Sequence, residues 1–218
     1  LGVSAGLSSN VVQIRVMAIN EHLVAMVKAP RIGRVKTRLG RDIGHVWAWG
    51  FYRRMLRTVL LPLARDRRWT TWLAVSPDGA LLQGRLWPVR TPRLTQGYGD
   101  LGDRMGGVMA VMPPGPVVII GTDIPGIRTR HIDQAFRALG THDAVFGPAN
   151  DGGYWLVGLK RRPALKNIFA RVRWSSEHTL ADTRANLPAH WRVAELEVLT
   201  DVDDGGTYAA LKQKRAVV

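Results

Sequence analysis

A cationic loop near the beginning of the chain carries residue types that could hold a phosphate group. Six Lys or Arg occur between positions 28 and 41, with no Asp or Glu before Asp42. Pro30 and Gly33 interrupt regular structure between an apolar run at 23–27 and a helix-forming segment from about 43 to 64. A loop between a strand and a helix can place cations and backbone N–H groups around a phosphate chain. A solvated basic turn would have the same composition, so downstream residues must decide between the two interpretations.

A carboxylate at Asp123 is well placed to hold a metal ion. It follows the apolar run at 116–120, which predicts a buried strand, and Ile124 and Pro125 come after it. Asp at the end of such a run contributes little to packing, and hard oxygen ligands suit Mg²⁺ or Mn²⁺. The alternative is that Asp123 only caps the turn that follows.

A third candidate lies at Asp151, which precedes two glycines and a strand beginning at Tyr154. Glycines permit a close backbone approach or a positive φ that a Cβ would obstruct. We expect Asp151 to orient an acceptor hydroxyl, or to act as its base, across from Asp123. An ordinary tight turn with a solvated Asp is the alternative, in which case Trp174 and Ser175 become the next acceptor-side candidates.

Several other kinds of site are excluded by composition and spacing. The chain has no Cys, which rules out disulfides and thiolate chemistry and weakly favours a cytoplasmic location. Its six His residues do not have zinc-site spacing. The first strand is followed neither by a Gly-x-x-x-x-Gly-Lys-Ser/Thr phosphate loop nor by a Gly-x-Gly-x-x-Gly dinucleotide motif.

The charge is strongly basic and unevenly spread. The chain has 31 Lys or Arg against 17 Asp or Glu, a formal net charge of +14. Residues 28–68 hold twelve Lys or Arg and two Asp, and so supply +10 of that excess. A polyanion-binding domain and an enzyme for phosphorylated substrates would both have this balance. Nucleic-acid binding is the less favoured interpretation, because it does not explain why Asp123, Asp151 and Asp203 should gather at one edge.

The order of apolar runs predicts an α/β fold, a three-layer α/β/α sandwich with a mainly parallel sheet. Expected strands lie at 23–27, 69–75, 86–89, 116–120, 144–146, 154–159 and 193–199. Expected helices lie at about 43–64, 129–139, 163–169, 177–187 and from 206 onward, and the glycine-rich segment at 96–105 is expected to run into a further helix that extends through 112. In open α/β sheets, ligands bind beyond the carboxyl ends of the strands, where the candidate residues lie.

The 218 residues suit one domain. Residues 21–218 are expected to form a single nucleotide-binding transferase domain. Residues 1–20 are expected to be a loose N-terminal extension, with the native start near Met17. They match neither a signal peptide nor a membrane span.

A set of short segments resembles a bacterial family of uncharacterised glycosyltransferase-like proteins, the nucleotide-diphospho-sugar transferases with the glycosyltransferase A fold. The segments occur in the family's order and extend over roughly residues 23–210. They are KAP at 28–30 through KTRL at 36–39, GDLGDRM at 99–105, GTDIP at 121–125, GPANDGGY at 147–154, WSS at 174–176 and DVD at 201–203. The first loop also resembles that of the molybdenum-cofactor and phospholactate nucleotidyltransferases, which share the fold. Ser176 departs from the usual Thr, and the residues after Asp203 depart from the usual Thr-Pro-x-Asp-Leu.

The resemblance implies roles for particular residues. The nucleotide phosphates would be contacted by Lys28, Gly33, Lys36 and Arg38. The base would lie near Gln96 and Gly102. Asp123 and Asp203 would bind Mg²⁺ or Mn²⁺.

The resulting expectation is a metal-dependent nucleotide-diphospho-sugar transferase that passes a group from a nucleotide-activated donor to an unidentified small-molecule acceptor. The first alternative is a nucleotidyltransferase that uses a nucleoside triphosphate and releases pyrophosphate. A non-enzymatic basic nucleic-acid-binding domain is the second alternative. Nucleotide sugar transfer is ranked first because the family description favours the sugar, although the cationic loop slightly favours a triphosphate.

Overall fold

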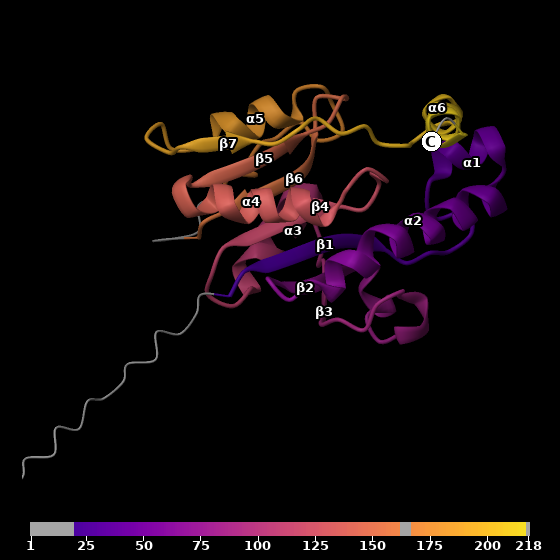
Figure 1. The fold of residues 1–218 in the computed structure, drawn as a ribbon, viewed down its shortest axis with the longest axis horizontal. Helices are drawn as coiled ribbons and strands as arrows, with labels where there is room; N and C mark the ends of the chain where they lie inside the picture. The colour runs from indigo at the N-terminus through magenta and orange to yellow at the C-terminus, as the bar shows by residue number, and fades with distance from the viewer. Residues whose placement is uncertain (1–19, 162–166, 217–218) are drawn as a thin grey trace, which may run out of the picture.

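A seven-stranded sheet forms the middle layer of the computed structural model (Figure 1). Its strands are β1 (His22–Lys28), β2 (Thr70–Ser76), β3 (Arg93–Thr95), β4 (Val117–Gly121), β5 (Ala144–Pro148), β6 (Tyr154–Leu159) and β7 (Val193–Glu195). They lie in the order β3-β2-β1-β4-β6-β5-β7. β6 runs antiparallel to β4 and β5, whereas the other neighbouring pairs are parallel. The predicted mainly parallel sheet is therefore confirmed.

Helices cover both faces of this sheet. They are α1 (Thr37–Ile43), α2 (His45–Arg65), α3 (Leu101–Val111), α4 (Thr129–Thr141), α5 (Thr179–Ala185) and α6 (Gly205–Ala216), with 3₁₀ turns at Asp78–Ala80 and Gly84–Leu86. Side chains of α2 and α4 pack on one face, and those of α3 and α5 pack on the other. This arrangement is the expected three-layer α/β/α sandwich. α6 lies beside α1 at one end of the molecule, beyond the carboxyl ends of β1 and β4 (Figure 1).

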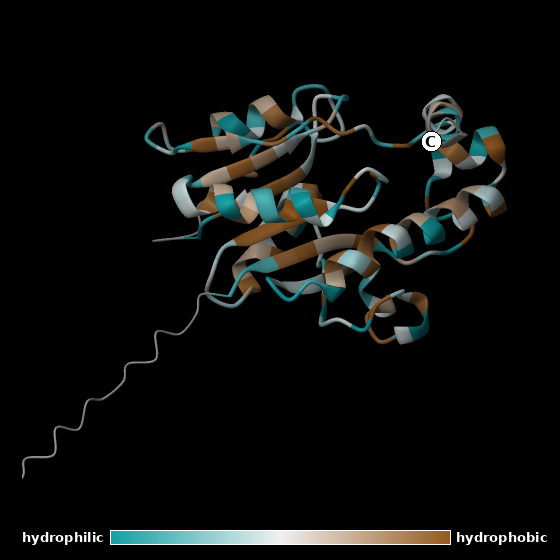
Figure 2. Ribbon diagram, in the orientation of Figure 1, coloured by the Kyte–Doolittle hydropathy of each residue, from teal (hydrophilic) through white to brown (hydrophobic). Residues whose placement is uncertain are grey.

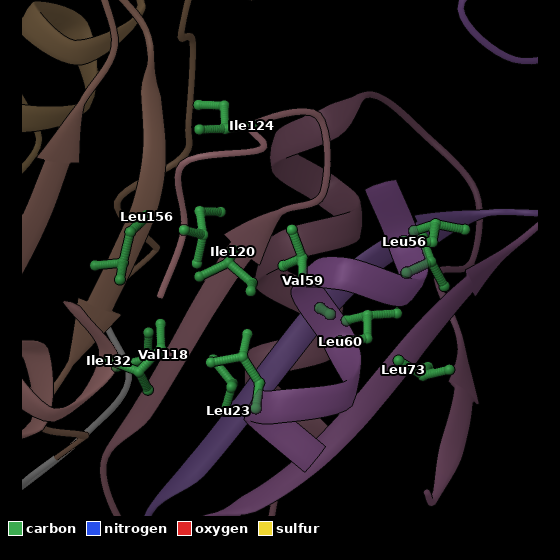
Figure 3. Packing of buried hydrophobic residues seen from close by; sticks show 14 of the residues in the cluster. Leu23, Leu56, Val59, Leu60, Leu73, Val118, Ile120, Ile124, Ile132 and Leu156 are labelled. Carbon is green, nitrogen blue, oxygen red and sulfur yellow. The ribbon is translucent and has the colours of Figure 1, made fainter. Parts of the chain in front are cut away.

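The sheet is held between the helices because successive strand residues point to opposite faces. In β1, Leu23 and Ala25 join the core beneath α2 and α4, while Val24 joins the core beneath α3. Leu60 of α2 is fully buried within the first core and is seen there beside β1 and β2 (Figure 3). The strands are accordingly apolar along most of their length, and the polar residues gather on the outer sides of the helices (Figure 2).

The structure describes residues 20–161 and 167–216. The expected extension at 1–20 and the expected start at Met17 therefore lie almost wholly outside the described residues. The helix expected at 163–169 lies partly outside them too, and the described part of that segment is a turn. Within the described ranges, no helix is both long enough and apolar enough to cross a membrane.

Two expected elements differ from those observed. Residues 37–43 form α1 instead of the end of the loop, and Gly44, with φ +90°, separates it from α2. The edge strand expected at 86–89 is instead a 3₁₀ turn and bend, and the edge strand β3 lies further on at Arg93–Thr95. Pro88 explains this shift, because proline cannot donate a hydrogen bond to a neighbouring strand.

The start of α3 is determined by two acidic residues. The Asp100 carboxylate accepts a hydrogen bond from the Asp103 backbone N–H, and the Asp103 carboxylate accepts one from Asp100. This reciprocal pair is a capping box, which satisfies N–H groups that the first turn of a helix leaves free. Gly102 lies between the two and packs against Phe169 and Trp174.

Gly102→Ala and Gly107→Ala should have opposite effects on stability, although both glycines lie in α3. A Cβ at Gly102 would meet Trp174 Cζ2 at 2.7 Å and the Phe169 carbonyl oxygen at 2.9 Å. Such overpacking should lower the free energy of unfolding by about 1–3 kcal/mol. A Cβ at Gly107 would meet no atom within 4 Å, so this variant should gain about 0.5–1 kcal/mol. Urea unfolding of both variants measures the difference, and equal effects would contradict the packing assigned to Gly102.

Candidate functional site

A cleft of about 450 Å³ opens at the carboxyl ends of β1, β2 and β4. Five cationic side chains line it, together with two carboxylates and several neutral groups. The cations are Lys28, Arg34, Lys36, Arg38 and Arg104, and the carboxylates are Asp123 and Asp203. Small-molecule sites in open α/β sheets occur at such edges and have volumes of about 300–1,000 Å³.

Lys36 joins the two carboxylates. Its Nζ lies 2.9 Å from Asp123 Oδ1 and 2.7 Å from Asp203 Oδ1, and its side chain is only 3% exposed. Burial by itself would lower the pKa of Lys36, but the two carboxylates outweigh it and raise that pKa above its usual value. The ammonium group therefore stays protonated and connects the loop after β1 to two segments distant in sequence.

The backbone of Lys36 is unusual as well. Its φ of 46° and ψ of 51° place it in the left-handed region, which non-glycine residues rarely adopt. This conformation immediately precedes α1. Ion pairs to two other segments hold a backbone geometry that the isolated loop would rarely adopt.

Asp123 and Asp203 can meet on a single cation. Both contact the same ammonium nitrogen, and their side chains remain 58% and 41% exposed. In the described part of the chain, no group of three or more His, Asp or Glu is arranged to hold a metal ion. Mg²⁺ needs only one or two carboxylates when phosphate oxygens and water complete its shell. The two carboxylates thus fit a divalent ion shared with a phosphorylated ligand.

A further carboxylate, that of Asp201, lies near both Asp203 and Asp151. Burial, followed by the nearby carboxylates of Asp203 and Asp151, raises the pKa of Asp201 to about 6. Asp151 itself is exposed and does not line the cleft, and its Oδ1 accepts a hydrogen bond from Gly153 N at 2.9 Å. Asp151 is therefore near Asp201, which in turn is near the cleft residue Asp203.

The glycine that needs its special conformation in this loop is Gly152. Its φ is +80°, and a Cβ there would overlap the backbone of Glu177. The Gly152 carbonyl also accepts a hydrogen bond from Leu180 N at 3.0 Å. Gly152 thus supports the turn before α5, whereas no positive φ is found at Gly153.

Tyr52 of α2 fixes the end of β1. Its hydroxyl accepts a hydrogen bond from Lys28 N and donates one to Lys28 O, both at 3.0 Å. Burial, and then the nearby Asp123 charge, raise the pKa of Tyr52, so it remains a neutral phenol. Thr122 is similarly buried and donates to Met26 O at 3.0 Å. Sequence reasoning missed both residues, although a polar side chain on the apolar face of a helix was a signal at Tyr52.

Of the other residues expected to contact the nucleotide, some line the cleft and some do not. Gln96 lines the cleft and its Nε2 donates to Val27 O at 3.2 Å and Ala74 O at 2.8 Å. Neither Gly33 nor Gly102 lines the cleft. Gly33, with φ +71°, lies in the turn just before Arg34, and Gly102 faces Phe169 and Trp174. Arg38 is exposed, and its guanidinium lies 3.9 Å from Asp203.

Similar folds occur in several solved structures. A protein from Desulfovibrio desulfuricans G20 that is assigned as a nucleotide-diphospho-sugar transferase has 28% identity and a TM-score of 0.76, over 90% of this chain and 95% of that one. The 4-diphosphocytidyl-2C-methyl-D-erythritol synthase from Anaerococcus prevotii DSM 20548 has 10% identity and a TM-score of 0.58, over 89% and 99%. The manganese complex of Rv0371c from Mycobacterium tuberculosis H37Rv has 15% identity and a TM-score of 0.56, over 89% and 98%.

These structures agree with the expected fold and support a transferase role. No protein of curated function matches the chain at the sequence level. The family described as "Uncharacterized protein conserved in bacteria (DUF2064)" matches residues 59–176, more than half of the chain. The chain therefore belongs to the DUF2064 family of bacterial proteins.

Proposed function

We propose that this protein transfers a sugar from a nucleoside-diphosphate donor held in the cleft. The observation that carries the proposal is the Lys36 ammonium between Asp123 and Asp203, at the edge of a cleft with five cations. A donor diphosphate is an anion that these cations would neutralise. The similarity to the Desulfovibrio protein supports a nucleotide sugar as the donor.

The cations of the cleft come from separate structural elements. Lys28 ends β1, Arg34 lies on the loop after it, and Arg104 reaches the cleft from α3. Cationic hydrogen-bond donors on separate elements can surround a diphosphate and stabilise the charge that develops on it as it leaves. Gln96 would fix the floor of the cleft, because its amide joins the ends of β1 and β2.

Asp123 and Asp203 are the residues that would hold a divalent metal ion, since they already meet on one cationic nitrogen. When bound, the ion supplies electrostatic stabilisation of the departing phosphate oxygens. The exposure of both carboxylates leaves room for phosphate oxygens and water.

Transfer would take place on the side of Asp151 and Asp201. An acceptor hydroxyl oxygen forms a bond to the anomeric carbon, and the bond from that carbon to the diphosphate oxygen breaks. The hydroxyl proton passes to a carboxylate, and the nucleoside diphosphate leaves. Asp201 is the first candidate for this base because it lies near Asp203 at the border of the cleft, although Asp201 itself does not line the cleft, and its raised pKa is compatible with the role. Asp151 remains the alternative base or an orienting group.

Nucleotidyl transfer is the second candidate, and the five cations in the cleft are the observation that favours it. A triphosphate carries more negative charge than a diphosphate, so more cations are needed to hold it. Incubation with nucleotide sugars and with nucleoside triphosphates, each with Mg²⁺ or Mn²⁺, distinguishes the candidates. Release of a nucleoside diphosphate indicates sugar transfer, and release of pyrophosphate indicates nucleotidyl transfer.

Asp123→Asn and Asp203→Asn should each remove most of the metal dependence of nucleotide binding. Both carboxylates contact the Lys36 ammonium and would share the metal ion in the proposed site, and an amide is a weaker metal ligand than a carboxylate. Isothermal titration with a nucleotide sugar, with and without Mn²⁺, measures the effect. Asp66→Asn is the control, because Asp66 ends α2 away from the cleft. Unchanged metal dependence in both cleft variants would refute the proposed metal site.

Lys36→Ala should weaken nucleotide binding by about 1.5–3 kcal/mol, the range for hydrogen bonds to charged groups. Arg38→Ala should cost less, because Arg38 is exposed and its pairing with Asp203 is long. Arg67→Ala, at an exposed position outside the cleft, should have almost no effect. Equal losses at Lys36 and Arg67 would mean that the net charge alone attracts the nucleotide.

Asp201→Asn should stabilise the fold at pH 7 and abolish transfer. The folded pKa of about 6 lies above the usual value of 3.8, so the native carboxyl loses stability as the pH rises through that interval. Removing the charge should recover about 1 kcal/mol at pH 7, after allowance for screening by water, and almost nothing at pH 3.5. Thermal unfolding at both pH values, combined with product assays, checks this. Full turnover by Asp201→Asn, with loss of turnover by Asp151→Ala, would assign the base to Asp151.

A further inference from the structure

The corner between α1 and α2 exposes apolar side chains in the most basic part of the chain. Trp47 and Val46, in the first turn of α2, are 74% and 61% exposed. Ile32, in the loop after β1, is 54% exposed. An exposed Trp beside an exposed Val needs an explanation, because large aromatic side chains are usually at least partly covered.

Two contacts join the loop that carries Ile32 to the side of α2 that carries Val46, and Trp47 is offset from that side by about 100° around the helix. Trp49 Nε1 donates to Pro30 O at 2.7 Å, which ties α2 to the loop that carries Ile32. The Arg53 guanidinium stacks over the Trp49 ring at 4.8 Å. Val46 precedes Trp49 by nearly one helical turn, so Val46, Trp49 and Arg53 form one stripe along α2. The corner lies at the edge of the molecule far from β7 (Figure 1).

The surface around these apolar side chains carries exposed arginines that form no ion pair with a described residue. α2 contains four Arg and no Asp or Glu. Arg31, Arg53 and Arg57 are exposed, and none forms an ion pair with any described residue. α2 packs its buried apolar side chains against the sheet, and Arg53 and Arg57 lie on its exposed side.

We propose that this corner, defined by Arg31, Ile32, Val46, Trp47, Arg53 and Arg57, docks the protein on an anionic phospholipid surface. Trp and short aliphatic side chains insert at the boundary between headgroups and acyl chains, while arginines beside them bind lipid phosphates. The protein lies on the bilayer and does not span it. This inference is independent of the proposed transfer, because none of these six residues lines the cleft.

A lipid surface explains the corner better than a nucleic acid does. Duplex DNA would account for the arginines, since phosphate contacts dominate its binding. It would leave Ile32, Val46 and Trp47 without a suitable partner at the surface of the duplex. An anionic bilayer uses both the charges and the apolar side chains.

Vesicle flotation with the full chain tests the proposal. Vesicles of phosphatidylcholine alone are compared with vesicles that also contain phosphatidylglycerol, at low and high salt. The wild type should float only with the anionic vesicles and should be released by salt. The double variant V46S/W47S should reduce partitioning about ten-fold or more, because it removes the inserted apolar groups. The variant R53S/R57S should reduce partitioning roughly 25-fold, because each arginine contributes about five-fold.

Matched controls carry equivalent changes elsewhere. L82S/V111S removes two other exposed apolar side chains, and R90S/R192S removes two exposed arginines that, like Arg53 and Arg57, form no ion pair with a described residue. Both controls should partition like the wild type, and all variants should retain its melting temperature. Equal binding to neutral vesicles, or unchanged binding of V46S/W47S, would overturn the proposal. Salt-sensitive binding to random duplex DNA that depends on Arg53 and Arg57 but not on Trp47, without vesicle binding, would identify a nucleic-acid surface instead.

Discussion

The buried ammonium of Lys36 joins the three segments from which the site is built. It lies after β1, while its partners Asp123 and Asp203 follow β4 and β7. With Lys36 absent, two carboxylates would face each other without a cation, and the left-handed backbone before α1 would lose its support. The same three charges fix the local fold and, in the proposed function, would also place Asp123 and Asp203 to hold a metal ion beside a diphosphate.

The C-terminal segment is fastened so that Asp203 can take part. The Gly205 N–H donates to the Asp42 carboxylate at 2.7 Å, immediately after the segment that carries Asp203. Tyr208 of α6 also packs edge-on against Phe51 of α2, at 5.2 Å between ring centres. The Asp204 carboxylate accepts a hydrogen bond from Thr207 N at 2.8 Å, and this cap explains how α6 begins although the residues after Asp203 depart from the family pattern. Because α6 is fixed in this way, the carboxylate of Asp203, which precedes the helix, is held against the loop that follows β1.

Much of the fold could be predicted from the sequence because its signals are local. Apolar runs of four or five residues predicted β1, β4 and β6, and the alternation with helices predicted a mainly parallel sheet. The predictions were wrong where local signals were ambiguous. Residues 37–43 form a helix although they belong to a basic loop, and Pro88 moved the edge strand to Arg93–Thr95. The capping box at Asp100 and Asp103 shows that one motif of the resemblance builds a helix start.

The sequence by itself determined the fold class, the basic loop and the candidate carboxylates at Asp123, Asp151 and Asp203, since residue types and nearest neighbours are enough for those. Only the tertiary structure decided which charges meet. Lys36 and Asp203 are 167 residues apart, and they meet because β1 and β4 are neighbours and the segment after β7 returns to the end of β4, where Val202 N donates to Asp123 O. The tertiary fold also brought Asp151 close to Asp201, placed the Tyr52 hydroxyl against the Lys28 backbone, and turned Gly102 towards Phe169 and Trp174. Electrostatic coupling and burial depend on distances in space, and these distances are set by the packing of all layers together.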